Sequence, residues 1–333
     1  MTYLESLNTA LHELMQNDNV VLIGEDLLDP YGGAFKVSKG LSTEFPKQVI
    51  STPISEQAIT GAAVGMAMRG MKPIVEIMFG DFITLCADQI INHATKYHWM
   101  FNAQVDVPVV IRTPMGGGRG YGPTHSQSLE SMFLSVPNLT IVAPSIFHDP
   151  GKMLKKCVNN ANNPLLFIES KVSYPKNLIQ GKDLNGVHIE YLPESNNDSL
   201  LLELYPEEQS DVLIITYGGM SEVAANCVYE SFISEEIIVT VLVLGSVKPL
   251  DTQSIVTLAR KIGRILVLEE GCITGGWGAE VSSIIHERCL HSLIKPVSRL
   301  GSKDFPIPAS MPMELEILPN LGCLQKKVVE LAK

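Results

Sequence analysis

The sequence predicts an α/β fold made of two doubly wound domains. Short apolar runs such as VVLIG, VPVVIRT and EIIVTVLVLG alternate with stretches of helical periodicity along the chain. Nearly continuous apolarity is typical of strands buried on both faces, and an alternating order favours parallel sheets covered by helices. At 333 residues the chain exceeds the usual size of one hydrophobic core, so two domains are expected.

The first domain takes its elements from the apolar runs and the stretches between them. The runs predict strands at 20–24, 72–79, 107–113, 139–144 and 164–170. The intervening periodicity predicts helices at 55–69, 83–101, 127–134 and 148–161. These elements give a parallel, doubly wound sheet.

A stretch rich in Pro, Asn, Gly and Ser separates the two domains. Periodicity fades between 172 and 209, which is typical of a connector. We therefore expect a first domain at 1–185, a linker at 186–209 and a smaller domain at 210–333. In the smaller domain, strands are expected at 211–219, 236–245 and 263–271, each followed by a helix.

Charge and composition exclude several classes of protein. A formal net charge of −11 and a pI of about 5.2 leave no basic patch for nucleic acid or anionic membranes. No apolar run approaches the roughly 20 residues that cross a bilayer, and the start MTYLESLNTALHELM resembles neither a secretory nor a transit signal. Six cysteines without C-x-x-C spacing indicate neither a zinc site nor a disulfide framework. A cytoplasmic protein is expected.

Glu56 is the first candidate for chemistry. It stands where a strand gives way to a helix of small residues, in VISTPISEQAITGAAVGMAMRG, with Ser55 as a candidate N-cap. Small residues let a ligand or another backbone approach closely. A carboxylate in the first turn also complements the helix dipole, and spacing alone favours that structural interpretation. Further on, Asp81 and Phe82 follow a buried strand, where open α/β sheets bind ligands, although core packing explains the ring as well.

The segment RTPMGGGRGYGPTHSQS contains the second candidate, His125. Its five glycines suit a loop that meets a ligand or a partner. Neither nucleotide-binding glycine motif is present, so a phosphate loop is weakly supported. His125 could be a general acid or base, because imidazole side chains in general titrate near neutral pH, although a lone loop histidine is more often only solvated. The other histidines lack zinc spacing, and no catalytic transition metal is expected.

Several blocks together resemble the beta subunits of thiamine-diphosphate-dependent 2-oxo acid dehydrogenases, in the transketolase-like class. They are, in family order, GEDLLDPYGGAFKVSKGL, TPISEQAITGAAVGMAMRGMKPIVEIMF, THSQS, VAPS and GGWGAEV. The resemblance covers most of the chain. It implies a pyrimidine-binding domain of the transketolase type, followed by a C-terminal domain that supports assembly.

The resemblance also implies roles for individual residues. Glu56 matches the glutamate that hydrogen-bonds the pyrimidine ring nitrogen of thiamine diphosphate, a bond that is stronger in an apolar crevice than in water. Phe82 matches a ring that packs on the pyrimidine, and Ile54 is expected to contact the cofactor too. His125, in THSQS, matches the histidine that assists acyl transfer to the lipoyl group.

One family motif is absent. Transketolase-like enzymes hold magnesium and the diphosphate through G-D-G and asparagines about thirty residues later, an oxygen site of the kind magnesium favours. Here Gly80-Asp81 is followed by Phe82 and by no suitable asparagine pair. The resemblance thus implies an α2β2 heterotetramer, with Mg²⁺ held by the alpha subunit and the cofactor shared. CVNNANNPLLF resembles a structural potassium region, but its aspartate is missing, which leaves potassium open.

The leading hypothesis for function is oxidative decarboxylation of a 2-oxo acid. Pyruvate is the default substrate, and the acyl group passes to lipoyl-lysine of a separate acyltransferase. Two alternatives remain open. The chain could belong to a thiamine-dependent carboligase, because the sequence does not identify the molecule that accepts the product of decarboxylation. It could also be a non-catalytic scaffold subunit. The linker HIEYLPESNNDSLLLELYPEEQSD departs from the family pattern.

Overall fold

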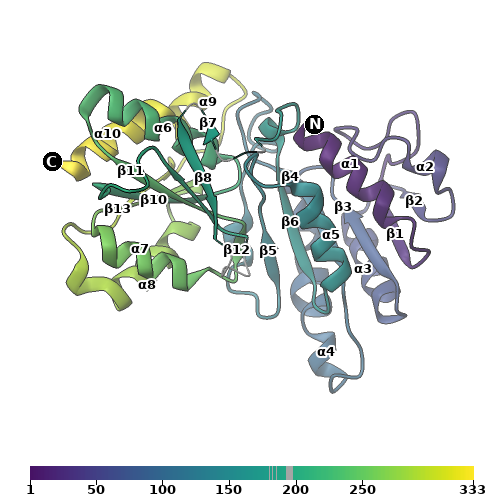
Figure 1. The fold of residues 1–333 in the computed structure, drawn as a ribbon. Coiled ribbons are helices and arrows are strands. Elements are labelled where there is room, and N and C mark those ends of the chain that lie inside the picture. Colours follow the sequence, from purple (N-terminus) through teal and green to yellow (C-terminus); the bar gives the residue numbers. More distant parts are fainter. Residues whose placement is uncertain (180, 182, 185, 193–197) are drawn as a thin grey trace. The chain divides into compact units, whose positions relative to one another are not determined.

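A computed structural model of the chain describes residues 1–179, 181, 183–184, 186–192 and 198–333. It divides into two compact units (Figure 1). Unit 1 comprises Met1–Met115, Met132–Val142 and Asp149–Leu178, and unit 2 comprises Gly116–Ser131, Ala143–His148 and Ile179–Lys333. The units interleave in sequence, whereas the sequence predicts contiguous domains at 1–185 and 210–333.

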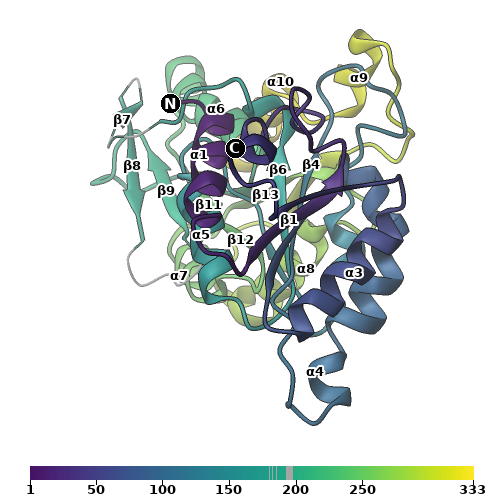
Figure 2. The ribbon, with the colours of Figure 1, turned by 90° about the vertical axis from the view of Figure 1, so that its right-hand side faces the viewer.

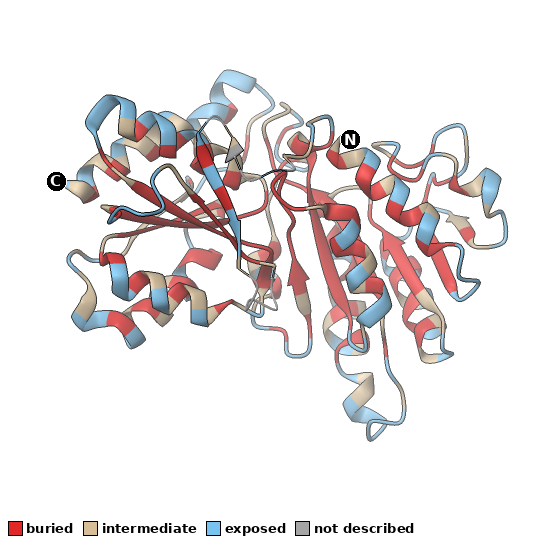
Figure 3. Ribbon diagram, in the orientation of Figure 1, coloured by how far each residue is buried: buried red, intermediate tan, exposed pale blue. Residues whose placement is uncertain are grey.

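The strands of unit 1 form a parallel sheet in the order β5-β6-β4-β3-β1-β2. Most positions in these strands are buried, as the continuous apolar runs predict (Figure 3). The strands are β1 (Val20–Glu25), β2 (Val49–Thr52), β3 (Lys72–Glu76), β4 (Val110–Met115), β5 (Thr140–Val142) and β6 (Leu165–Ser170).

Helices cover both faces of this sheet. Figure 2 shows β1 between α1 (Tyr3–Leu14) and α3 (Glu56–Met68), and α5 (Pro150–Asn160) packs against α1. Thr2 and Glu5 form a capping box that begins α1. Asp149 caps α5, and Pro150 occupies its first turn. Unit 1 also contains the short helix α2 (Leu41–Glu44) and the 3₁₀ turn η4 (Lys171–Ser173).

Two predicted helices are replaced by shorter elements. Residues 83–101, expected to form one helix, carry the 3₁₀ helix η1 (Gly80–Cys86), the π-helix η2 (Gln89–Ala94) and α4 (Tyr97–Met100). The side chain of Thr95 donates to the Ile91 carbonyl, a bond of the kind that bends a helix. Residues 127–134 form only the 3₁₀ turn η3 (Glu130–Phe133), since Pro137 follows and cannot continue a helix.

Unit 2 has a mixed sheet in the order β14-β13-β10-β11-β9-β8-β7. The parallel strands are β10 (Val212–Tyr217), β11 (Val239–Leu244), β13 (Ile265–Cys272) and β14 (Ser298–Ser302). In Figure 1, α6 (Met220–Glu235) and α10 (Leu321–Ala332) cover one face, while α7 (Thr252–Ile262) and α8 (Trp277–Cys289) cover the other. The remaining elements are β12 (Ser246–Lys248), η5 (Leu290–Ser292) and α9 (Met311–Ile317).

The stretch 186–209, expected to be a linker, contains strands. β8 (Val187–Tyr191) pairs with β7 (Asp183–Leu184) and with β9 (Leu200–Glu203), and β9 pairs antiparallel with β11. Alternation of buried and exposed residues in β8 gives it one apolar face, which its polar composition conceals. Residues 193–197 of the expected linker lie outside the described residues. Within the described part of the chain, no helix is long and apolar enough to cross a membrane.

Candidate functional site

Glu56 begins α3 directly after the carboxyl end of β2. The side chain of Ser55 accepts a hydrogen bond from Ala58 N at 3.4 Å, which caps the helix as the sequence predicts. Glu56 itself is only 7% exposed, although it is the first residue of the helix. Its backbone carbonyl accepts the Sγ–H of Cys86 at 3.5 Å, which ties the first turn of α3 to η1. A largely buried carboxylate is therefore held at the sheet edge where open α/β sheets bind ligands.

A second carboxylate, Glu25, lies beside Glu56. It ends β1, which pairs in parallel with β2, and it is 7% exposed. Burial raises the pKa of Glu25, and the charges of Glu56 and Asp26 raise it further, while a hydrogen bond from the backbone N–H of Ser55 lowers it. Among the described residues, none donates a hydrogen bond to Oε1 of Glu25. Both residues are largely buried, and within the described part of the chain Oε1 of Glu25 is a buried acceptor without a hydrogen-bond donor.

Aromatic rings line the neighbouring strand end. Phe82 packs edge-on against Phe79, with centroids 5.9 Å apart, and Phe79 packs edge-on against Phe35 at 5.4 Å. Phe82 lies in η1 and is half-buried, so part of its surface can contact a ligand. Ile54 is 80% exposed. Glu56, Phe82 and Ile54 thus all belong to unit 1, at or near the carboxyl ends of β2 and β3.

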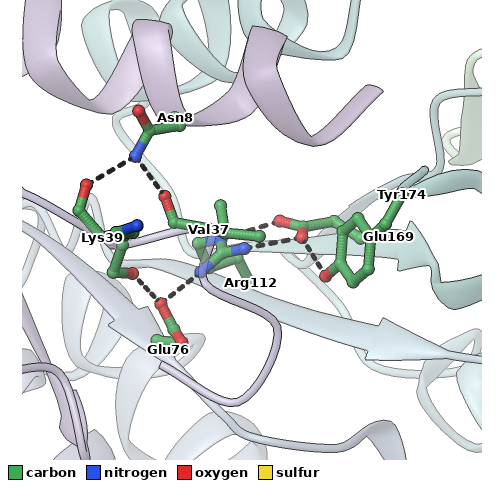
Figure 4. Close-up of polar contacts among 8 residues, drawn as sticks. Asn8, Val37, Lys39, Glu76, Arg112, Glu169 and Tyr174 are labelled. Carbon is green, nitrogen blue, oxygen red and sulfur yellow. Dashed lines mark hydrogen bonds and ion pairs between the residues drawn. The ribbon is translucent and has the colours of Figure 1, made fainter. Parts of the chain in front are cut away.

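A buried ion network lies behind this edge (Figure 4). Arg112 donates to both oxygens of Glu169 at 2.7 and 2.6 Å and also pairs with Glu76. Tyr174 donates to Glu169 at 2.6 Å, and Ser38 donates to Glu76. Burial alone lowers the pKa of Arg112, but the charges of Glu169 and Glu76 outweigh it and raise that pKa. The network ties β3, β4 and β6 to one another.

The network also anchors the loop that carries the PYGGAFK block. Besides the Ser38 contact with Glu76, the side chain of Asn8 donates to the carbonyls of Val37 and Lys39 at 2.7 and 3.0 Å (Figure 4). Gly33 packs so closely on the Glu76 carboxylate that a Cβ would collide with it. Its φ of +79° also favours glycine. These contacts make the block a structural turn.

The glycine-rich loop lies in unit 2, and carboxylates of the same unit hold it. Gly117 N donates to Glu270 at 2.6 Å, while Gly118 N and Gly120 N donate to the two oxygens of Glu314 at 2.9 and 2.8 Å. These backbone N–H groups are the donors that a phosphate loop would use. Since protein carboxylates already occupy three of them, the loop is built for internal support.

His125 follows this loop and is half-buried. Its backbone N–H donates to Gly122 O at 3.3 Å, and its Nδ1 lies 3.0 Å from the Thr124 hydroxyl. The Thr124 hydroxyl beside Nδ1 helps to orient the ring. His125 belongs to unit 2 and Glu56 to unit 1, so each is described within its own unit.

Within the described residues, no group of three His, Cys, Asp or Glu side chains is placed to hold a metal ion. In the segment CVNNANNPLLF, the carbonyl of Asn159 accepts from the Lys72 ammonium at 2.9 Å. The Lys72 ammonium is therefore hydrogen-bonded to one carbonyl of the segment that resembles a potassium-binding region.

Sequence reasoning missed Glu25 and Glu314. Glu25 ends an apolar strand, and in the sequence a carboxylate at that place indicates the start of a loop. Only the pairing of β1 with β2 brings Glu25 close to Glu56. Glu314 stands in MPMELEIL, where apolar neighbours suggest that the acidic residue faces solvent. Both lie on elements whose packing partners come from distant parts of the chain.

Two family models match the chain. "Transketolase, pyrimidine binding domain" matches residues 1–177, and "Transketolase, C-terminal domain" matches residues 204–321. Among solved structures, a split-gene transketolase described as an inactive beta4 tetramer aligns with a TM-score of 0.74 at 21% identity, covering 100% of this chain and 99% of that one. This likeness confirms the predicted two-domain, transketolase-like α/β fold.

Relatives with assigned names indicate which family of transketolase-like proteins the chain resembles. The 2-oxoisovalerate dehydrogenase subunit beta of Bacillus subtilis is 36% identical over 100% of this chain and 99% of its own length. The pyruvate dehydrogenase E1 component subunit beta of Rickettsia conorii is 33% identical over 100% of this chain and 97% of its own. Full-length matches at this identity show that the chain belongs to the family of 2-oxo acid dehydrogenase beta subunits.

Proposed function

We propose that this chain supplies the pyrimidine-binding half of a thiamine-diphosphate-dependent pyruvate dehydrogenase, working as an α2β2 heterotetramer. The observation that carries the proposal is the burial of Glu56 at the carboxyl edge of the sheet, beside Glu25. A carboxyl in that environment forms a strong hydrogen bond with a ring nitrogen, since water does not compete for it.

Each cofactor contact falls on a residue with suitable chemistry. The Glu56 carboxyl holds a proton at the ring nitrogen of the aminopyrimidine, and the half-buried Phe82 ring packs on the flat pyrimidine. Thiamine diphosphate, when bound, supplies the electron sink for decarboxylation, while the protein orients it and excludes water. Exposed Ile54 is placed to contact a cofactor that is shared with another polypeptide.

The alpha subunit is proposed to hold the diphosphate and Mg²⁺. The chain lacks the G-D-G motif, and three N–H groups of its glycine-rich loop bond to Glu270 and Glu314 instead of a phosphate. Potassium is left open, because the Lys72 ammonium already meets the Asn159 carbonyl. His125 is proposed to assist acyl transfer to lipoyl-lysine of an acyltransferase, with the protein working in the cytoplasm.

Reconstitution with the alpha subunit tests the proposal. The assembled protein is assayed with pyruvate and with 2-oxoisovalerate, first with a dye acceptor and then with a lipoyl domain. We expect thiamine-dependent turnover that is fastest with pyruvate and transfers acyl groups to the lipoyl domain. Faster turnover of 2-oxoisovalerate than of pyruvate would show that pyruvate is the wrong substrate. Acyl transfer to aldehydes alone would indicate a carboligase. Absence of turnover would indicate a scaffold subunit.

A further inference from the structure

Helix α9 reverses the usual pattern of burial. Glu314 is the buried residue of this helix, at 1% exposure. Its neighbours Met311, Met313 and Leu315 are 52%, 60% and 54% exposed. Burial of a charged group is costly unless its oxygens are hydrogen-bonded, whereas methionine and leucine normally prefer the interior. The orientation of Glu314 therefore depends on specific partners.

Those partners are backbone N–H groups of the glycine-rich loop. Glu314 accepts one hydrogen bond on each oxygen, from Gly118 at 2.9 Å and from Gly120 at 2.8 Å. Glu270 accepts from Gly117 at 2.6 Å. Charge-assisted bonds of this kind are about twice as strong as neutral ones. Two carboxylates thus bind three backbone N–H groups of the loop.

Gly117 and Gly120 of the loop are packed closely against neighbouring residues. A Cβ on Gly117 would lie 2.7 Å from Leu318 and 2.9 Å from Glu314, and one on Gly120 would lie 3.0 Å from the Ala309 carbonyl. Gly116, Gly118, Gly120 and Gly122 all have positive φ. Chains so rich in glycine lose much entropy when they are ordered, so a defined conformation needs added contacts. The region around α9 supplies those contacts.

The same loop leads directly to His125. Gly116 N donates to Gln127 O at 3.4 Å and closes the base of the loop, while His125 N donates to Gly122 O at 3.3 Å. The residues bonded by Glu270 and Glu314 lie between Gly116 and Gly122, that is, between the base of the loop and the residue that contacts His125. We propose that Glu314 is a positioning residue for His125, acting through the backbone of residues 117–122. The inference rests on the proposed role of His125 in acyl transfer.

A glutamine at position 314 separates this role from packing alone. Glu314→Gln keeps the size of the side chain, but its amide nitrogen is a donor and would face a backbone N–H. One of the two loop bonds is therefore lost. Glu316→Gln is the matched control, because Glu316 lies two residues along the same helix, is exposed and carries the same charge.

The first measurement follows the loop without using activity. Hydrogen–deuterium exchange is recorded for a peptide covering residues 116–124 in the heterotetramer assembled with the alpha subunit. We expect at least about tenfold faster exchange in Glu314→Gln than in Glu316→Gln or the wild type, since a lost hydrogen bond opens the loop locally. Unchanged exchange in this peptide would overturn the proposal, whatever the enzyme does.

The second measurement compares two half-reactions. Because a small misplacement of a reacting group costs up to about a hundredfold in rate, Glu314→Gln is expected to lower kcat for lipoyl acylation about tenfold. The KM for the lipoyl domain and the dye-coupled decarboxylation should stay within about twofold. Equal loss in both half-reactions would mean a general structural role and would overturn the inference.

Two further variants keep the test decisive. Glu270→Gln can still accept the Gly117 N–H but removes the charge that strengthens this bond, so it should show a smaller effect in the same direction. It serves if Glu314→Gln does not assemble, and no effect on exchange or acylation would then overturn the inference. His125→Ala tests the proposed function separately. If that variant acylates lipoyl domains normally, the role of His125 fails, while the exchange data still decide whether Glu314 holds the loop.

Discussion

Glu25 and Glu56 lie close enough for the charge of Glu56 to raise the pKa of the Glu25 carboxyl, to which burial makes the largest contribution. Each is 7% exposed, and they come from adjacent parallel strand ends. Like charges in a poorly solvated site resist ionising together. Glu25 therefore keeps its proton more readily than a solvated carboxyl does.

Glu56→Gln should abolish most of the decarboxylation while leaving assembly intact. The amide cannot share a proton with the pyrimidine nitrogen as a carboxyl does, and loss of such a proton transfer typically costs about 10²–10⁴-fold in rate. The measurement is dye-coupled turnover with saturating cofactor, next to size-exclusion chromatography of the heterotetramer. Asp18→Asn is the control for a change of charge, because Asp18 is exposed and precedes β1, at the opposite end of that strand from Glu25. Turnover by Glu56→Gln at the wild-type rate would remove Glu56 from the mechanism.

Glu25→Gln should make the protein more stable above neutral pH but not in acid. The pKa of Glu25 is raised from 4.5 in the folded state, so its contribution to stability is fully present below that value and is lost as the pH rises through the raised pKa. Glutamine removes the cost of ionising the buried group. Thermal unfolding at about pH 4 and about pH 8 tests this linkage. A gap between variant and wild type that is the same at both pH values would contradict it.

His125→Ala should separate the two half-reactions. If His125 serves acyl transfer, lipoyl acylation falls by about 10²-fold or more, in the range of a lost general acid or base, while dye-coupled decarboxylation changes little. His188, on β8 and exposed, provides a control substitution, His188→Ala. Equal losses in the two assays would exclude a role confined to transfer.

The strands were the most predictable part of the fold. Runs such as VVLIG and LLFIES are apolar because both faces of a parallel strand are covered, so each run marks its strand with little shift. The segment 83–101 was less predictable, because its helical periodicity does not distinguish 3₁₀, π and α hydrogen bonding. β8 escaped prediction since its apolar face amounts to Val187 and Ile189 among polar residues.

The candidate site was predictable only where a local pattern marks it. Ser55 and Glu56 stand at a strand-to-helix junction, which the sequence alone displays. The proximity of Glu25 follows from the register of β1 with β2, in which Glu25 pairs with Thr52. Glu314 reaches the glycine-rich loop over nearly two hundred residues of sequence, and no local pattern encodes such a contact.

Arg112→Met should destabilise the protein strongly. Arg112 is 1% exposed and lies between Glu76 and Glu169, so its removal leaves two buried carboxylates without a cation. Breaking a buried pair in this way typically costs about 3–5 kcal/mol, because the remaining charge is neither solvated nor compensated. The measurement is the free energy of unfolding in urea, compared with that of the wild type.

The pH dependence of this loss identifies its cause. Burial already raises the pKa of Glu76 although Arg112 opposes the shift, so without Arg112 the Glu76 carboxyl binds a proton still more readily. A raised folded-state pKa makes stability greatest in acid, and the deficit of Arg112→Met should widen as the pH rises. Lys152→Met is the control. It removes the ion pair of Lys152 with Asp149, in which the lysine side chain is 77% exposed. This change should alter the free energy of unfolding by less than about 0.5 kcal/mol at any pH. A pH-independent deficit in Arg112→Met would indicate lost packing in place of uncompensated charge.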